Sequence, residues 1–159
     1  MPSVYVASPF GFSVATRGYY DDVLLPALRA AGWTPHDPWA DQDGTVTARL
    51  QAIGRLPPTE QLVALRELNG TLAAANERLL RSADAVFAVL DGPDVDSGTA
   101  AEIGFAAALG HPVAGLRLDT RRTGDNHGTT VNLQVEHWVT LGVHRTLEAA
   151  VLALAAALR

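Results

Sequence analysis

Short apolar runs alternate along the chain with longer segments that have helical spacing. Ser3–Ala7 alternates and contains β-branched residues, and 85–90 is continuously apolar, so both segments predict buried strands. Shorter apolar runs predict two further strands at 33–37 and 113–118. These four segments supply the expected sheet.

The segments between these strands predict helices. Ser13 is a suitable N-cap for a helix that reaches Ala31, with Gly32 as its stop, and Pro26 should kink it. A longer helix is expected from Pro57 to Ser82, where leucines recur at intervals of three and four. Further helices are expected over 47–53, 100–109 and 147–158, and a short element should begin near Asn132.

Strands and helices therefore alternate, which is typical of a parallel sheet with helices on both faces. The length of 159 residues fits one domain over 1–159. Ligands of such folds bind beyond the carboxyl ends of the strands. The loops at these ends are 8–13, the segment from Pro38 onward, and 91–98, and they outline one candidate pocket.

Composition narrows the chemistry. The chain has no cysteine and no lysine, which excludes disulfides, thiolate nucleophiles and lysine Schiff bases. The five histidines show no metal-ligand spacing, so we expect neither a metal nor a cofactor. The net charge is −5 and the largest basic cluster is Arg121-Arg122, which argues against nucleic acid as a partner. Without a signal pattern or a spanning apolar run, we expect a cytoplasmic protein with no membrane contact and a small-molecule ligand.

Glu102 is the only charged residue between Ser97 and Gly110, in a segment rich in alanine. One interpretation is structural, since Thr99-Ala-Ala-Glu102 fits a capping box at a helix start. The other is catalytic, because Asp96 and Glu102 would provide two carboxylates near one pocket, the minimum for glycosyl chemistry. Gly98, between them, would let the backbone approach a ligand.

Several neighbouring residues have two interpretations. Asp91 and Asp94 flank Gly92-Pro93 and fit turn positions, or they contact a ligand. Tyr5 belongs to a core strand, and its hydroxyl needs a partner if it is buried.

The aromatic residues of the loops are also ambiguous. Phe10 and Phe12 either pack as part of a lid or form a stacking surface for a flat heterocycle, and Trp39 allows the same two interpretations. Asp41-Gln42-Asp43-Gly44 lacks the remaining ligands of a calcium loop and is interpreted as a turn.

Three stretches together resemble the nucleoside 2-deoxyribosyltransferase family. They are Asp96-Ser-Gly-Thr-Ala-Ala-Glu102-Ile-Gly-Phe-Ala followed by Ala108-Leu-Gly-His-Pro-Val, Val4-Tyr5-Val-Ala-Ser-Pro-Phe10, and Val131-Asn132-Leu133. The resemblance spans about residues 3–140. It implies a flavodoxin-like (Rossmann-like) α/β fold and transfer of 2-deoxyribose between a deoxynucleoside and a free nucleobase through a covalent intermediate.

The resemblance also implies roles for individual residues. Glu102 matches the family's nucleophile, Tyr5 the tyrosine that orients it, and Asp96 the aspartate that holds the sugar hydroxyls. Asn132 matches an asparagine that reaches the neighbouring subunit's pocket, which implies a homo-oligomer, either a dimer or a trimer of dimers. Gln42 matches a glutamine that contacts the base.

One position departs from the family. The family commonly has an aspartate on the long helix that contacts and protonates the base, and Asn76 stands at that position. An amide can hydrogen-bond a base but cannot be a general acid. The proton must then come from Asp91, Asp94 or water, or the base preference differs.

Two other functions stay open at this point. Relatives with the same fold and glutamate hydrolyse nucleoside 5′-monophosphates, and Ser8, Ser13, Arg17 and Ser97 could supply phosphate donors. The third is a non-catalytic nucleotide-binding module in which Glu102 only caps its helix.

Overall fold

The computed structural model describes residues 1–41 and 43–157 and contains a five-stranded sheet with the order β2-β1-β3-β4-β5, parallel in every pairing. The strands are β1 (Ser3–Ala7), β2 (Thr34–His36), β3 (Ala85–Val89), β4 (Val113–Leu116) and β5 (Val143–His144). This is the flavodoxin-like order, so the predicted fold class is confirmed. The pattern predicted four of the strands and missed β5, which has only two residues.

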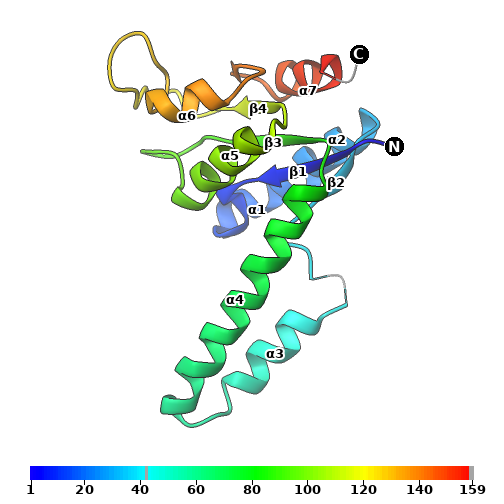
Figure 1. Ribbon diagram of the computed structural model, residues 1–159, viewed down its shortest axis with the longest axis vertical. Helices are drawn as coiled ribbons and strands as arrows, with labels where there is room; N and C mark the ends of the chain where they lie inside the picture. The colour runs from blue at the N-terminus through cyan, green and yellow to red at the C-terminus, as the bar shows by residue number, and fades with distance from the viewer. Residues whose placement is uncertain (42, 158–159) are drawn as a thin grey trace.

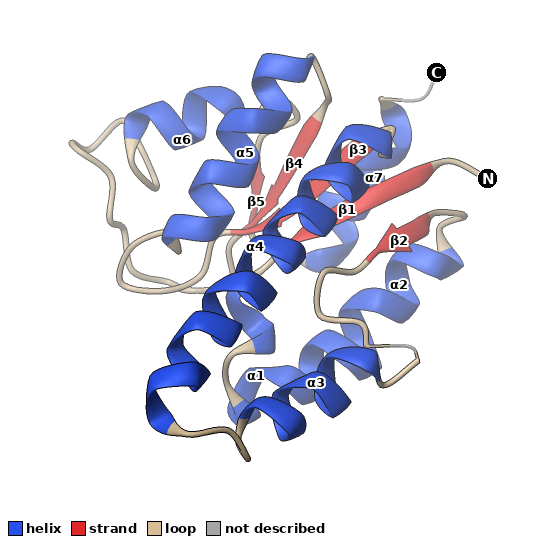
Figure 2. Ribbon diagram, turned by 60° about the horizontal axis from the view of Figure 1, so that its bottom comes forward, coloured by secondary structure: helices blue, strands red, loops and turns tan. Residues whose placement is uncertain are grey.

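Helices cover both faces of the sheet, as Figures 1 and 2 show. They are α1 (Val14–Tyr19), α2 (Leu25–Ala30), α3 (Thr45–Ile53), α4 (Pro58–Ser82), α5 (Ser97–Leu109), α6 (Leu133–Trp138) and α7 (Leu147–Ala156). A single 3-10 turn, Pro9–Gly11, follows β1.

The expected kink at Pro26 takes a specific form. The helical path from Val14 to Ala30 is unbroken but widens into a π turn, Tyr20–Leu24, separated from Pro26 by one residue. Proline removes one backbone donor from a helix interior, and a π turn is a recognised way to change the bonding locally. The π turn also carries Tyr20, whose fully buried ring packs in the core and whose hydroxyl bonds Asp37.

Strand alternation divides the core into two layers. Val4, Val6, Phe87 and Val89 pack with α2 and α7 on one face of the sheet. Tyr5, Ala7, Val86, Ala88 and Leu90 pack with α5, α6 and the end of α4 on the other. Side chains on a strand alternate between faces, so Tyr5 must point toward α5 once its neighbours are buried on the opposite side.

Helices α3 and α4 form an arm that extends away from the sheet, and only the C-terminal end of α4 reaches the sheet (Figure 1). Leu80, near that end, is buried in the layer shared with α5. In the described part of the chain, no helix combines the length and the apolar character needed to cross a membrane.

Two glycines give a paired test of this packing. A Cβ at Gly115 in β4 would lie 2.9 Å from both Leu90 Cδ1 and Val139 Cγ1, which are buried, whereas a Cβ at Gly70 in α4 would meet nothing within 4 Å. Gly115→Ala should lower the free energy of unfolding by about 1–3 kcal/mol through overpacking. Gly70→Ala should raise it by up to about 1 kcal/mol through helix propensity. Urea unfolding of both variants checks the pair, and a stable Gly115→Ala protein would contradict the tight contact.

Candidate active site

Two cavities meet at Glu102. The larger, of about 540 Å³, lies between the 3-10 turn after β1, the segment after β2 and the helices α3, α4 and α5. The smaller, of about 340 Å³, lies between α4 and α5 beside Tyr5. Asn76, Gly98 and Glu102 line both cavities, so these residues mark their junction. The junction lies at the carboxyl edge of the sheet, where the fold class predicts a ligand.

The Tyr5 hydroxyl donates a hydrogen bond of 2.5 Å to Glu102 Oε1. Tyr5 lies on β1 and is fully buried, while Glu102 lies on α5 and is half-buried. The contact therefore joins the sheet to the helix across 97 residues of sequence. The sequence predicted that the buried hydroxyl would need a partner, and the structure identifies this partner as Glu102.

Burial raises the pKa of Glu102 from 4.5 to about 6, the Tyr5 hydrogen bond opposes this shift, and the charge of Asp96 adds to it. Burial also raises the pKa of the Tyr5 hydroxyl, with the Glu102 charge as the next cause, so Tyr5 stays a donor. Glu102 is thus mostly ionised at neutral pH but is stabilised less than a carboxylate in water. A buried charge that is kept at a cost in stability is typical of functional sites.

The capping-box interpretation of Glu102 is wrong. Helix α5 begins at Ser97 and its N-cap is Asp96, whose Oδ2 accepts a bond of 3.0 Å from the Thr99 backbone N–H. Glu102 lies in the second turn, where the helix dipole has weakened and no free backbone donor remains for it to bind. The donor that favours the ionised form of Glu102 is therefore the Tyr5 hydroxyl and not the helix start, and burial still raises the pKa of Glu102.

Phe12 and Trp39 form an aromatic corner of the larger cavity. Their rings meet edge to face at 4.5 Å, and Phe12 is 74% exposed. The Trp39 ring lies against Gly11, where a Cβ would come within 2.2 Å of it, and Trp39 Nε1 donates to the Ser8 carbonyl. The stacking interpretation therefore fits Phe12 and Trp39.

Phe10 does not line either cavity. It is 7% exposed and packs edge to face against Tyr19 in the core beneath the loop. For Phe10 the packing interpretation is correct, because the 3-10 turn directs its ring inward.

Asn76 and Gly98 lie where the sequence placed them. Asn76, on α4, faces Glu102 across the junction of the cavities. Ser97 is exposed at the first position of α5, next to Gly98. Gly98 has an open surface except toward Asp96 Oδ2, which a Cβ would approach to 3.1 Å.

Other predicted site residues lie apart from the cavities. Asp91 Oδ1 accepts bonds from the backbone N–H groups of Leu118 and Asp119, and Asp94 Oδ1 accepts from the backbone N–H of Val95. Neither lines either of the two cavities. The bond of Asp94 is local to the predicted turn, whereas Asp91 joins its loop to the loop after β4. Gln42 lies outside the described residues.

Asn132 caps its own helix. Its Oδ1 accepts from the backbone N–H groups of Gln134 and Val135 at the start of α6. The side chain is exposed and does not line either of the two cavities.

The sequence pattern did not single out Asp37. Its Oδ1 accepts a bond of 2.6 Å from the Tyr20 hydroxyl and one of 2.9 Å from the Trp39 backbone N–H. Asp37 thereby fixes the start of the cavity wall that carries Trp39. The only available signal was its place at the end of the second strand.

The turn predicted before α3 is present. Asp41 accepts bonds from the backbone N–H groups of Val46 and Thr47 and from the Thr47 hydroxyl, and Gly44 has φ of +71°. These bonds lower the pKa of the Asp41 carboxyl, and the bond from the Thr47 hydroxyl has the largest effect.

In residues 1–41 and 43–157, no group of three or more histidine and acidic side chains has an arrangement that could hold a metal ion.

A sequence model of the nucleoside 2-deoxyribosyltransferase family matches residues 4–134 of the chain. The chain therefore belongs to this family of enzymes, and the predicted family is confirmed. No curated protein matches the chain significantly by sequence comparison.

Solved structures share the fold. The 2-desoxiribosyltransferase from Leishmania mexicana is 22% identical, covers 98% of both chains and has a TM-score of 0.67. A conserved protein from Enterococcus faecalis V583 is 24% identical, covers 97% of both chains and has a TM-score of 0.66. The 2-deoxyribosyltransferase from Bacillus psychrosaccharolyticus is 20% identical over 92% of this chain and 88% of that one, with a TM-score of 0.63.

The raised pKa of Glu102 predicts a pH-dependent gain in stability on removing its charge. Since the folded-state pKa of about 6 exceeds 4.5, ionised Glu102 destabilises the fold above pH 6, and the penalty disappears as the pH falls toward 4.5. Glu102→Gln should therefore raise the free energy of unfolding at pH 7.5 by on the order of 2 kcal/mol and have little effect at pH 4.5. Urea unfolding at both pH values measures this difference.

A matched control is Glu67→Gln, at an exposed position of α4. It should change stability by less than about 0.5 kcal/mol at either pH. A Glu102→Gln protein that is less stable than the wild type at pH 7.5 would contradict the cost assigned to this buried charge.

Proposed function

We propose that this chain transfers 2-deoxyribose between nucleobases by double displacement, with Glu102 as the nucleophile. The observation that carries the proposal is the Tyr5–Glu102 hydrogen bond at the junction of the two cavities. A carboxylate with a pKa of about 6 is ionised at neutral pH and only partly solvated, so it is ready to attack.

In the first step a Glu102 carboxylate oxygen bonds to C1′ of the deoxyribose while the bond from C1′ to the base nitrogen breaks. In the second step another base attacks C1′ and releases Glu102, so the configuration at C1′ is retained overall. Tyr5 binds Oε1, which orients the carboxylate and leaves Oε2 for the sugar. The absent 2′-hydroxyl makes the oxocarbenium-like transition state easier to reach.

In the proposed mode of binding, Asp96 contacts the sugar, and the aromatic corner formed by Phe12 and Trp39 contacts the base. Asp96 uses Oδ2 to cap α5, and Oδ1 remains for the sugar hydroxyls. Phe12 and Trp39 supply ring surfaces in the same cavity, and Asn76 supplies amide donors and acceptors beside Glu102. Ser97 and Gly98 form the small-residue edge over which the sugar enters.

The charge of the cavity favours a nucleoside over a 5′-monophosphate. Asp41, Asp96 and Glu102 line the larger cavity, and its described lining includes no arginine or histidine. Placing a phosphate dianion near three carboxylates without a cation is unfavourable. Arg17, a donor considered for phosphate, is paired with Asp21 at 2.8 Å.

The binding-module alternative loses its main support, because Asp96 caps α5 and Glu102 does not. A buried charge without a capping role is costly to a module that performs no chemistry.

We assign the proton for the leaving base to water. Asp91 and Asp94 bond backbone groups and do not line the cavity, and Asn76 cannot be an acid. Asp41 reaches the cavity, but its lowered pKa keeps it ionised. The larger cavity is open to solvent at the Phe12 side, where water can reach a bound base.

The proposed assembly is a homo-oligomer in which Asn132 reaches a neighbouring subunit's site. Its Oδ1 is used in capping α6, which leaves the amide NH₂ group as a donor to a bound nucleoside.

Base exchange tests the reaction. The wild-type protein, incubated with a 2′-deoxynucleoside and a different free base, should form the second deoxynucleoside by chromatography. Its rate should fall below about pH 6, as Glu102 becomes protonated. Glu102→Ala should lower the rate at least about a thousandfold and keep the fold. Free deoxyribose without exchange would indicate a hydrolase, and near wild-type turnover by Glu102→Ala would refute the nucleophile.

Subunit complementation tests the shared site. Asn132→Asp keeps a capping oxygen but loses the amide donor, so it should fold and be inactive. Mixed with Glu102→Ala under conditions of subunit exchange, it should recover part of the activity, because each mixed assembly can contain a site with both wild-type residues. Demonstrated exchange without recovery would show that each site is built within one chain.

A further inference from the structure

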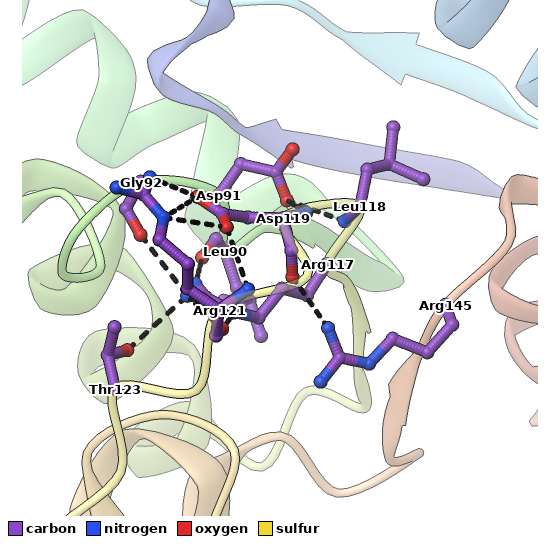
Figure 3. A network of polar contacts seen from close by, with 9 residues as sticks. All are labelled: Leu90, Asp91, Gly92, Arg117, Leu118, Asp119, Arg121, Thr123 and Arg145. Carbon is purple, nitrogen blue, oxygen red and sulfur yellow. Dashed lines mark hydrogen bonds and ion pairs between the residues drawn. The ribbon is translucent and has the colours of Figure 1, made fainter.

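The loops that leave β3 and β4 are tied to each other by reciprocal hydrogen bonds, shown in Figure 3. One loop runs from Leu90 to Asp96 and leads into α5. The other runs from Arg117 to Thr123 and has no residue in either cavity. We call this set of bonds the β3–β4 loop clamp. It consists of the Arg117 side-chain bonds and the two backbone bonds to Asp91.

Arg117 is the buried half of the clamp, with 0% exposure. Its guanidinium donates to the carbonyls of Leu90 and Gly92 on one loop, and to the Arg121 carbonyl and the Thr123 hydroxyl on its own loop. A buried guanidinium without a carboxylate partner is costly, and these oxygens compensate for it only while both loops keep their positions.

Asp91 supplies the bonds in the opposite direction. Its Oδ1 accepts from the Leu118 N–H at 2.6 Å and the Asp119 N–H at 3.1 Å. Asp119 is held in turn, since Arg121 pairs with its carboxylate and Arg145 donates to its carbonyl. The loop from Leu90 to Asp96 is therefore bonded to the loop from Arg117 to Thr123, whose own position is fixed by Arg121 and Arg145.

The clamp acts on the residues that precede Asp96. Gly92 has φ of +129° and a Cβ there would lie 2.8 Å from the Asp94 carbonyl, so this turn is restricted to glycine. After it, Val95 enters the core and Asp96 caps α5. The position of Asp96 relative to Glu102 is thus fixed by the clamp on one side and by the helix on the other.

We propose that Asp91 and Arg117 are positioning residues that hold Asp96 against the sugar and so determine how tightly the site binds the deoxyribose of its substrate. This inference rests on the proposed function, in which Asp96 binds the sugar hydroxyls. A displacement of Asp96 by about 1 Å would weaken contacts to a correctly seated deoxyribose by up to about a hundredfold. The proposed base contacts come from Phe12, Trp39 and Asn76, which the clamp does not bond, so binding of the base should change little.

The test compares Asp91→Ala with two matched variants. Asp91→Asn keeps an acceptor oxygen for the Leu118 and Asp119 N–H groups, and Asp94→Ala removes a carboxylate of the same loop that bonds only the adjacent Val95 N–H. Each variant is assayed for kcat/KM with 2′-deoxyadenosine and with 2′-deoxycytidine, and for KM of the acceptor base. Thermal unfolding confirms that each variant is folded.

Asp91→Ala should lower kcat/KM for both deoxynucleosides by about tenfold or more, with the KM of the acceptor base within about twofold of wild type. Asp91→Asn and Asp94→Ala should keep the wild-type kcat/KM. Arg117→Lys, which keeps the charge but not the fork of donors, should lower kcat/KM as Asp91→Ala does. An unchanged kcat/KM in folded Asp91→Ala overturns the inference, as does an Asp91→Asn variant as impaired as Asp91→Ala, which would indicate direct substrate contact.

Calorimetry separates failure of this inference from failure of the proposed function. The same nucleosides are titrated into Glu102→Gln, which cannot turn them over, with and without Asp91→Ala. Deoxynucleoside binding to Glu102→Gln that weakens by about tenfold or more in the double variant supports the inference without reference to turnover. Equal affinity in the two proteins overturns the inference alone. No binding of either deoxynucleoside to Glu102→Gln overturns the proposed function and the inference together.

Discussion

The hydrogen bond from the Tyr5 hydroxyl to Glu102 is the constraint on which the site depends. Tyr5 is fixed by a strand whose neighbours Val4 and Val6 are fully buried on the opposite face, so its ring can point only toward α5. Glu102 is fixed by a helix whose Ile103 and Ala106 pack on the same layer. The core therefore sets the geometry of the carboxylate, and no mobile loop is needed to orient it.

Sequence periodicity could predict the elements that pack by regular spacing, and through them the site. Alternation in β1 was sufficient to place Tyr5 in a core strand with a hydroxyl that needs a partner, and the isolated charge in α5 singled out Glu102, which is that partner. The start of α5 could not be predicted, because Asp96, Ser97 and Thr99 are all good capping residues and only tertiary packing selects among them. β5 and Arg117 were missed, since two residues carry no period and a buried arginine resembles a surface one in sequence.

The charges that line the site restrict the ligands that it can bind. Three carboxylates line the larger cavity, and its described lining holds no cation, while burial of Glu102 already raises its pKa to about 6. An anionic ligand would raise that pKa further and remove the ionised nucleophile. A neutral nucleoside adds no such charge. In the proposed function, this arrangement of charges therefore favours an uncharged substrate over an anionic one.

The segment from Asp96 to Glu102, at the start of helix α5, is fixed at both of its ends. The β3–β4 loop clamp fixes the chain before Asp96, and Tyr5 fixes the second turn at Glu102. Between them Gly98 keeps the surface low enough for a sugar to approach. Because the two carboxylates belong to one short segment with two external anchors, their separation is restricted by the fold. Such preorganisation suits the proposed displacement, in which Glu102 attacks the sugar carbon while Asp96 holds the same ring.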